Sequence, residues 1–220
     1  MPRAPQLVTE LVGTFVFLFV ISLSGLSGSF APVAIGMALL AMVYMGGHIS
    51  GAHYNPAVTL GLFLRRKIAW LHALAYWGAQ LAGGVLAFVA GYLVSGQAPG
   101  IHPGPKVQAL QALGVEIIFT AGLLLVVLNV AATKRTHGNS FYGMAVGFFI
   151  AAAIFVGGPI SGAAYNPAVG FGATLGAAIF AGGGWSDLWL YVAGPVIGAA
   201  IGAGINYLQL DRPEPGDITP

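Results

Sequence analysis

Two stretches of this 220-residue chain are nearly identical. GGHISGAHYNPAVTLG occupies residues 46–61 and GGPISGAAYNPAVGFG occupies residues 157–172, and the two agree at 12 of 16 positions without a gap. The shift between them is 111 residues, about half of the chain. A match of this length at this spacing indicates a duplication, so the fold must place two equivalent segments in equivalent surroundings.

The composition indicates that most of the chain is not surrounded by water. Charged side chains make up 6% of the residues and hydrophobic ones 57%, with a mean hydropathy of +0.86, whereas a soluble domain carries about 25% charged residues. The pI near 9.0 comes from short clusters and not from a basic stripe, so we expect no nucleic-acid partner. No cysteine is present, which excludes disulfides and thiolate metal sites.

Six apolar runs have lengths near the roughly 20 residues that a helix needs to cross a bilayer. They are Leu7–Leu26, Pro32–Ile49, Ala69–Val94, Leu110–Ala132, Phe141–Val156 and Leu188–Leu208, of which the second and fifth are slightly short. Six spans put both termini on one side. Seven of the eight cationic residues fall on that side, leaving Lys106 opposite, and positive charge marks cytoplasmic loops. We therefore expect cytoplasmic termini, an external loop at Ser95–Lys106 and a polar cytoplasmic tail at 211–220.

The duplication extends beyond the matching stretches. TELVGTFVFLFV near the start has a counterpart in VEIIFTAGLLLVV, and each carries one glutamate in an apolar run, Glu10 and Glu116. Each copy contains three spans, an odd number, so the copies sit upside down relative to one another. The sequence predicts an all-α membrane protein with an inverted 3+3 repeat in a single domain, 1–210, in which the copies cover about 7–94 and about 110–208.

Each Asn-Pro in the repeated segment begins a run that is too short to cross the membrane. Asparagine is a preferred N-cap and proline suits the first helical turn, which predicts helices from Asn55 to Leu64 and from Asn166 to about Leu175. Ten residues rise about 15 Å, half of a hydrocarbon core about 30 Å thick. We expect six transmembrane helices plus two re-entrant half-helices that meet at the midplane, with Asn55 and Asn166 together.

The residues before each asparagine are expected to line a pore. Non-helical backbone at this depth is tolerated where it is packed in protein or lines a water-filled cavity. Extended chain there would turn backbone carbonyls toward the cavity, from Gly51, Ala52, His53 and Tyr54 in the first copy and from Gly162, Ala163, Ala164 and Tyr165 in the second. Two helix N-termini would repel cations at the centre. The asparagine amides can donate to one central water oxygen and interrupt a proton wire.

These motifs resemble the aquaporin family, also called major intrinsic proteins. The resemblance covers nearly the whole chain: the glutamate of the first span, GHISGAHYNPAVTLG, YWGAQLAGG, VEIIFTAG, the second Asn-Pro-Ala and GPVIGAAIGAGINY. It implies the hourglass fold, passive conduction of water or small neutral solutes, one pore per subunit and a homotetramer in the plasma or inner membrane. It also implies that Glu10 and Glu116 brace the loops, and that the pore centre is formed by Asn55, Pro56, Ala57, Asn166, Pro167 and Ala168.

One position departs from that family. Its members usually carry arginine three residues after the second pore asparagine, in a constriction near the external mouth, and this chain has Val169. The other constriction positions, counted without gaps, are Ile35, Ile154 and Ala163, so this selectivity filter has only apolar side chains. Such a mouth is either wider and less wettable than that of a strict water channel, or closed enough by the isoleucines to slow water by dewetting.

Other functions stay open from the sequence. One is a channel mainly for ammonia, hydrogen peroxide, glycerol or neutral metalloid acids with slow water, although Gly170 and Phe171 replace the aspartate that glycerol channels of the family carry nearby. Another is a coupled secondary transporter, which also uses inverted repeats and broken helices, but the spans hold no acid besides Glu10 and Glu116. No nucleophile–base pair, phosphate loop or metal-ligand spacing is present, so we expect no enzyme, cofactor or metal site.

Overall fold

The computed structural model describes residues 1–210, which contain helices and no strand. Six long helices are α1 (Ala4–Leu23), α2 (Ala31–Ser50), α4 (Trp70–Ser95), α5 (Ala109–Val130), α6 (Tyr142–Ser161) and α8 (Leu188–Gln209). Two shorter ones are α3 (Pro56–Leu64) and α7 (Pro167–Phe180), and two 3-10 turns are η1 (Ser24–Phe30) and η2 (Lys134–Thr136). The tail predicted at 211–220 lies outside the described residues.

The six predicted spans correspond to the six long helices. The 47 residues of Ala4–Ser50 are helical and contain one charged residue, Glu10, so no charged loop separates α1 from α2. The separation occurs at Gly28 within η1, where φ is 55° and ψ is −130°. Glycine adopts such angles at little cost, and α2 then packs back along α1.

Helix α6 runs further than the sequence predicts. The expected end at Val156 is wrong, because the helix continues through Pro159 to Ser161. Gly157 serves packing and not chain reversal: a Cβ there would lie on the hydroxyl oxygen of Tyr165. The helix ends only at the next residue, a glycine with φ of 88°, which is a common way for helices to stop.

Helix α7 is also longer than expected. It continues past Leu175 to Phe180, 14 residues against the 9 of α3. Helix α3 ends where the charged triplet Arg65–Lys67 begins, whereas the chain after Leu175 stays apolar until the glycines that start at Gly182. The half-helices are therefore unequal in length although their first turns match in sequence.

The long helices pack in the same pairs in both copies. Helix α1 packs against α2 and α4, α5 packs against α6 and α8, and α2 contacts α6 across the middle. A Cβ on Gly83 would lie 2.5 Å from the carbonyl oxygen of Leu11, and a Cβ on Gly198 would lie 2.5 Å from that of Ile117. Both the α1–α4 and the α5–α8 crossings thus require glycine, as close helix packing in membranes commonly does.

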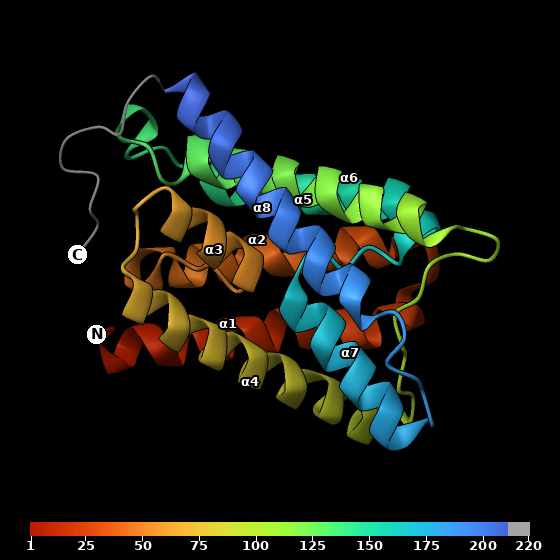
Figure 1. The fold of residues 1–220 in the computed structure, drawn as a ribbon. Helices are drawn as coiled ribbons and strands as arrows, with labels where there is room; N and C mark the ends of the chain where they lie inside the picture. The colour runs from red at the N-terminus through yellow and green to blue at the C-terminus, as the bar shows by residue number, and fades with distance from the viewer. Residues whose placement is uncertain (211–220) are drawn as a thin grey trace.

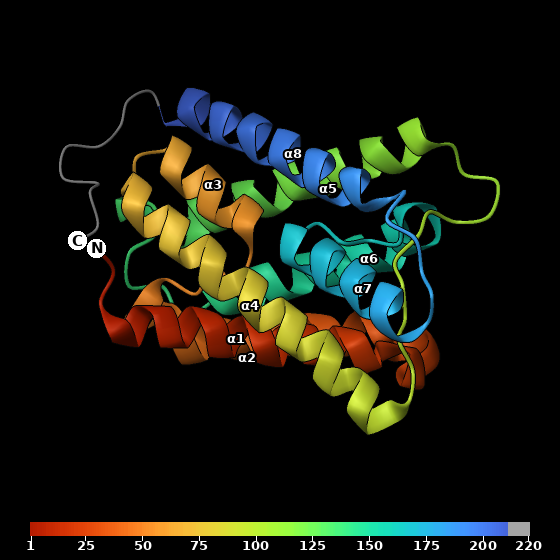
Figure 2. The ribbon, with the colours of Figure 1, turned by 60° about the horizontal axis from the view of Figure 1, so that its bottom comes forward.

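Figures 1 and 2 show how the short helices fill the middle of this bundle. Helices α3 and α7 start near one another at the centre and run outward toward opposite ends. The N-terminus and the end of α8 lie at the end that α3 approaches, here called the terminal face. The connection between α4 and α5 lies at the other end, the opposite face.

Candidate functional site

Both short helices begin at an asparagine that caps them. Asn55 has extended backbone angles, φ −154° and ψ 119°, and its Oδ1 accepts a hydrogen bond from the backbone N–H of Ala57 at 2.8 Å. Asn166 repeats this with φ −157° and ψ 113° and a bond of 2.9 Å from the N–H of Ala168. In each helix a proline occupies the first turn, where its missing N–H is not needed.

The same two asparagines also connect the two copies. The Nδ2 group of Asn55 donates to the backbone carbonyl of Tyr165 at 2.9 Å, and that of Asn166 donates to the carbonyl of Tyr54 at 3.0 Å. The side-chain amide of asparagine carries two N–H donors. Each asparagine therefore donates one N–H to the opposite loop, and its second N–H stays available. Both asparagines line a cavity. This exchange is absent from the sequence-based expectation, which assigned the amides to water alone.

The residues before each cap follow the same backbone path, and it is not extended. Left-handed angles occur at three of four positions in each loop, with φ of 88°, 51° and 49° at Gly51, Ala52 and Tyr54 and of 88°, 59° and 50° at Gly162, Ala163 and Tyr165. The expectation of extended chain is therefore wrong. Such angles at non-glycine residues cost about 1–3 kcal/mol each, so the surroundings must hold the loops in place.

This path leaves carbonyl oxygens without a protein donor. Within residues 1–210, no hydrogen bond is donated to the backbone carbonyls of Gly51, Ala52, His53, Gly162, Ala163 and Ala164. The flanking carbonyls are used: that of Ser50 accepts from the hydroxyl of Tyr76 at 2.8 Å, and that of Ser161 accepts from the hydroxyl of Tyr191 at 2.7 Å. Three successive acceptors in each loop are thus free for a solute.

Glu10 holds the first loop from within α1. Its Oε1 accepts from the hydroxyl of Ser50 at 2.7 Å and from the N–H of His53 at 2.9 Å. Its Oε2 accepts from the N–H of Tyr54 at 2.8 Å and from Nε2 of Gln80 at 2.9 Å. The side chain is fully buried, and four donors satisfy it, as a buried carboxyl group requires.

Glu116 does the same for the second loop with one donor fewer. It accepts from the hydroxyl of Ser161 at 2.7 Å, from the N–H of Ala164 at 3.0 Å and from the N–H of Tyr165 at 2.7 Å. Among the described residues, no side-chain amide takes the part that Gln80 takes in the first copy. The two loops therefore share a path but differ in how firmly they are held.

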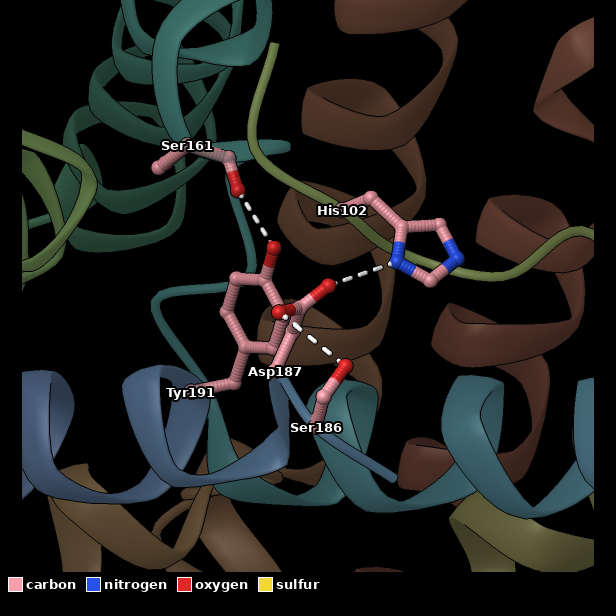
Figure 3. A network of polar contacts seen from close by, with 5 residues as sticks. All are labelled: His102, Ser161, Ser186, Asp187 and Tyr191. Carbon is pink, nitrogen blue, oxygen red and sulfur yellow. Dashed lines mark hydrogen bonds and ion pairs between the residues drawn. The ribbon is translucent and has the colours of Figure 1, made fainter. Parts of the chain in front are cut away.

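Sequence reasoning missed the serines and tyrosines that anchor the start of each loop. Ser50 and Ser161 hold the same place in the two copies of the repeated string, which was a usable signal. Tyr76 and Tyr191 are 115 residues apart, outside the 111-residue register, so nothing in the string points to them. Figure 3 shows the hydroxyl of Tyr191 donating to Ser161.

Two cavities meet at the loops. One of about 320 Å³ reaches from Asn55 and Asn166 to residues 136–139 near η2 on the terminal face. The other, of about 360 Å³, lies toward the opposite face. Ile21, Ile154 and Ala163 line both cavities, which places the boundary between the two cavities at these residues.

The four predicted filter positions come together in the opposite-face cavity. Ile35 from α2, Ile154 from α6, Ala163 from the second loop and Val169 from α7 all line it. No charged side chain of the described residues lines this cavity. Gly162 and Ala163, whose carbonyls accept no hydrogen bond within residues 1–210, line the same cavity, together with the polar residues Ser24 and Ser29.

Within residues 1–210, no three histidine, cysteine, aspartate or glutamate side chains are grouped so that they could hold a metal ion. His48, His53 and His137 line the terminal-face cavity, but they do not form such a group. The ring nitrogen Nδ1 of His53 lies 2.9 Å from the hydroxyl of Thr59, which also accepts from Gln80. His53 is thus tied into the network around Glu10.

Comparison with known proteins gives matches over most of the chain. Residues 2–207 match the family described as Major intrinsic protein. The rice proteins "Aquaporin NIP1-3" and "Probable aquaporin TIP3-2" are 39% and 36% identical, over 91% and 94% of this chain and 72% and 83% of their own lengths. The X-ray structure of the aquaglyceroporin from Plasmodium falciparum superposes with a TM-score of 0.83 at 22% identity, covering 95% of this chain and 97% of that one.

Proposed function

The chain belongs to the major intrinsic protein family, and from that premise we propose how its pore selects what passes. As a member of this family it is a passive membrane channel for water and small neutral solutes and not an enzyme. The remaining questions are which residues form the pore centre, which solutes the mouth admits, and how the channel sits in its membrane.

The pore passes between Asn55 and Asn166. The observation that carries this proposal is the exchange of hydrogen bonds in which each asparagine donates to the opposite loop. That bond fixes the side chain and leaves its second N–H for a solute in the cavity. A water molecule held by two such donors presents its own hydrogens outward to both neighbours, which interrupts a proton wire. The N-termini of α3 and α7 add partial positive charge that repels cations.

The mouth on the opposite face selects solutes that donate hydrogen bonds. Its filter side chains Ile35, Ile154 and Val169 are apolar. The free carbonyls beside them belong to Gly162 and Ala163, and the cavity lining also contains Ser24 and Ser29. Moving a polar group from water into an apolar mouth costs free energy when the group finds no hydrogen-bond partner there. Ammonia carries three N–H donors and one acceptor, whereas water carries two of each, so ammonia loses fewer partners there. We therefore expect ammonia to pass beside water.

We place both termini in the cytoplasm and the protein in the plasma or inner membrane. Cationic residues at the terminal face support this orientation, because cytoplasmic loops are enriched in them; among the described residues these are Arg3, Arg65, Arg66, Lys67, Lys134 and Arg135. The outward surface carries exposed apolar side chains such as Ile118 and Phe148, suited to lipid or to neighbouring copies. We also propose a homotetramer with one pore per subunit, as the resemblance to the family implies.

Stopped-flow light scattering on proteoliposomes tests the mouth. Water, ammonia, urea and glycerol permeabilities are compared for the wild type, Val169→Arg and the control Gln97→Arg, which adds the same charge to an exposed residue of the opposite face that lines neither cavity. Arginine at 169 brings donors and a charge into the filter, so ammonia permeability should fall while water is retained. Equal permeabilities for Val169→Arg and Gln97→Arg would show that position 169 is not in the filter.

A further inference from the structure

The segment that joins the two copies folds over the opposite-face mouth. The backbone N–H of Gly104 donates to the carbonyl of Ile160 at 3.0 Å. At Gly162, a Cβ would lie 2.8 Å from the carbonyl oxygen of His102 and 2.8 Å from Cγ1 of Ile101. Residues 101–104 are thus packed directly on the end of α6 and on the second re-entrant loop.

Ile101 reaches the same cavity as the filter. It lines the space of about 360 Å³ together with Ile35, Ile154, Ala163 and Val169. The segment joins one copy to the other, so the duplication provides no second version of it. The opposite-face mouth therefore has an apolar side chain that the repeat does not predict.

A polar contact holds this segment to the start of α8. Nδ1 of His102 lies 2.8 Å from Oδ2 of Asp187, with exposed side-chain fractions of 57% and 33%. Asp187 precedes α8 but does not cap it through its side chain, so its carboxylate is free to serve His102, with Ser186 at 3.4 Å on the other oxygen. Figure 3 shows this contact beside the bond from Tyr191 to Ser161, so Asp187 and the first turn of α8 together hold both the segment and the start of the second loop.

We propose that Ile101, an apolar side chain of the mouth outside the four filter positions, sets the size limit of the mouth, and that the contact between His102 and Asp187 positions it. The proposal rests on the filter described under the proposed function and adds a residue that lies outside both copies of the repeat. Shortening Ile101 should admit larger solutes, and releasing the contact should do the same to a smaller extent.

The absence of cysteine from the chain allows a direct test. Ile101→Cys in proteoliposomes is treated with a membrane-impermeant, cationic methanethiosulfonate reagent, and water permeability is measured by stopped flow. Leu26→Cys is the control, since Leu26 is 66% exposed in η1 and lines neither cavity. We expect loss of most water permeability at position 101, recovery after dithiothreitol, and no loss at position 26. Full labelling of Ile101→Cys without loss of flux would overturn the proposal.

Two further variants separate size from anchoring. Ile101→Ala should raise urea permeability relative to water on the order of tenfold, because apolar sites discriminate by size to about this extent. Asp187→Ala should raise it about twofold to fivefold, as expected for a partly exposed contact. An unchanged ratio in Ile101→Ala refutes the size limit, and an unchanged ratio in Asp187→Ala alone refutes the anchoring role. If Val169→Arg changes permeability while both variants match the wild type, the filter stands and only this inference fails.

Discussion

Replacing Glu116 by glutamine tests how the second loop is held. Glutamine keeps the size of the side chain but exchanges one acceptor oxygen for an NH₂ donor. Because Glu116 accepts from the N–H groups of Ala164 and Tyr165 and from the hydroxyl of Ser161 on its two oxygens, one backbone N–H then faces a donor. An unsatisfied buried N–H costs about 1–3 kcal/mol. At about 2–4 °C per kcal/mol for a chain of this size, the melting temperature should fall by about 2–12 °C.

The assay is thermal unfolding of the purified protein in detergent, with yield of the assembled protein measured in parallel. Asp187→Asn makes the same change at a partly exposed carboxylate, where a contact is worth about 0–1 kcal/mol, so it should lower the melting temperature less than Glu116→Gln does. If Glu116→Gln melts with the wild type but alters ion flux, Glu116 serves transport and not support of the loop.

Two further changes probe the packing and the asymmetry between the copies. Gly198→Ala should destabilise the protein by about 1–3 kcal/mol, because the new Cβ would lie 2.5 Å from the carbonyl oxygen of Ile117. Gly204→Ala is the control, since nothing lies within 4 Å of its new Cβ, and it should unfold like the wild type. Equal melting temperatures for the two variants would contradict the packing argument. Gln80→Leu removes one of the four hydrogen-bond donors to Glu10 and should lower the melting temperature. The ratios of urea and ammonia permeability to water permeability, measured by stopped flow, should not change. A changed ratio would mean that the hydrogen bonds around Glu10 affect the pore.

The repeat predicted the architecture because its constraint is global. Two copies with three spans each require an inverted arrangement, and Asn-Pro at the start of each short helix fixes where it begins. Both caps form at the expected residues, Asn55 and Asn166. The glutamates in the first span of each copy also lie against the loops, as the resemblance implied for Glu10 and Glu116.

The ends of the helices were less predictable, because glycine can either end a helix or allow close packing within one. Gly157 and Pro159 look like the end of a helix, yet α6 passes through both, and the glycine is there to admit the hydroxyl of Tyr165. That contact joins residues on separate elements. A sequence pattern within one helix holds no information about it.

The finer features of the site depend on contacts between the copies. The donation from Asn55 to Tyr165 spans 110 residues, and that from Gln80 to Glu10 spans 70. Ile101 lies in a segment that has no counterpart in the duplication. Its place in the mouth follows from how that segment packs on Gly162, and composition gives no sign of it.

Proton conductance of Asn166→Asp tests the centre of the pore most directly. Aspartate can still accept from the N–H of Ala168 and so keep the cap, but its carboxylate cannot donate to the carbonyl of Tyr54 or to a water molecule. Proteoliposomes with an internal pH-sensitive dye report proton flux while light scattering reports water flux. We expect the wild type to pass water without protons and Asn166→Asp to leak protons. A variant that conducts water as the wild type does, with no proton leak, would contradict the role given to the paired asparagines.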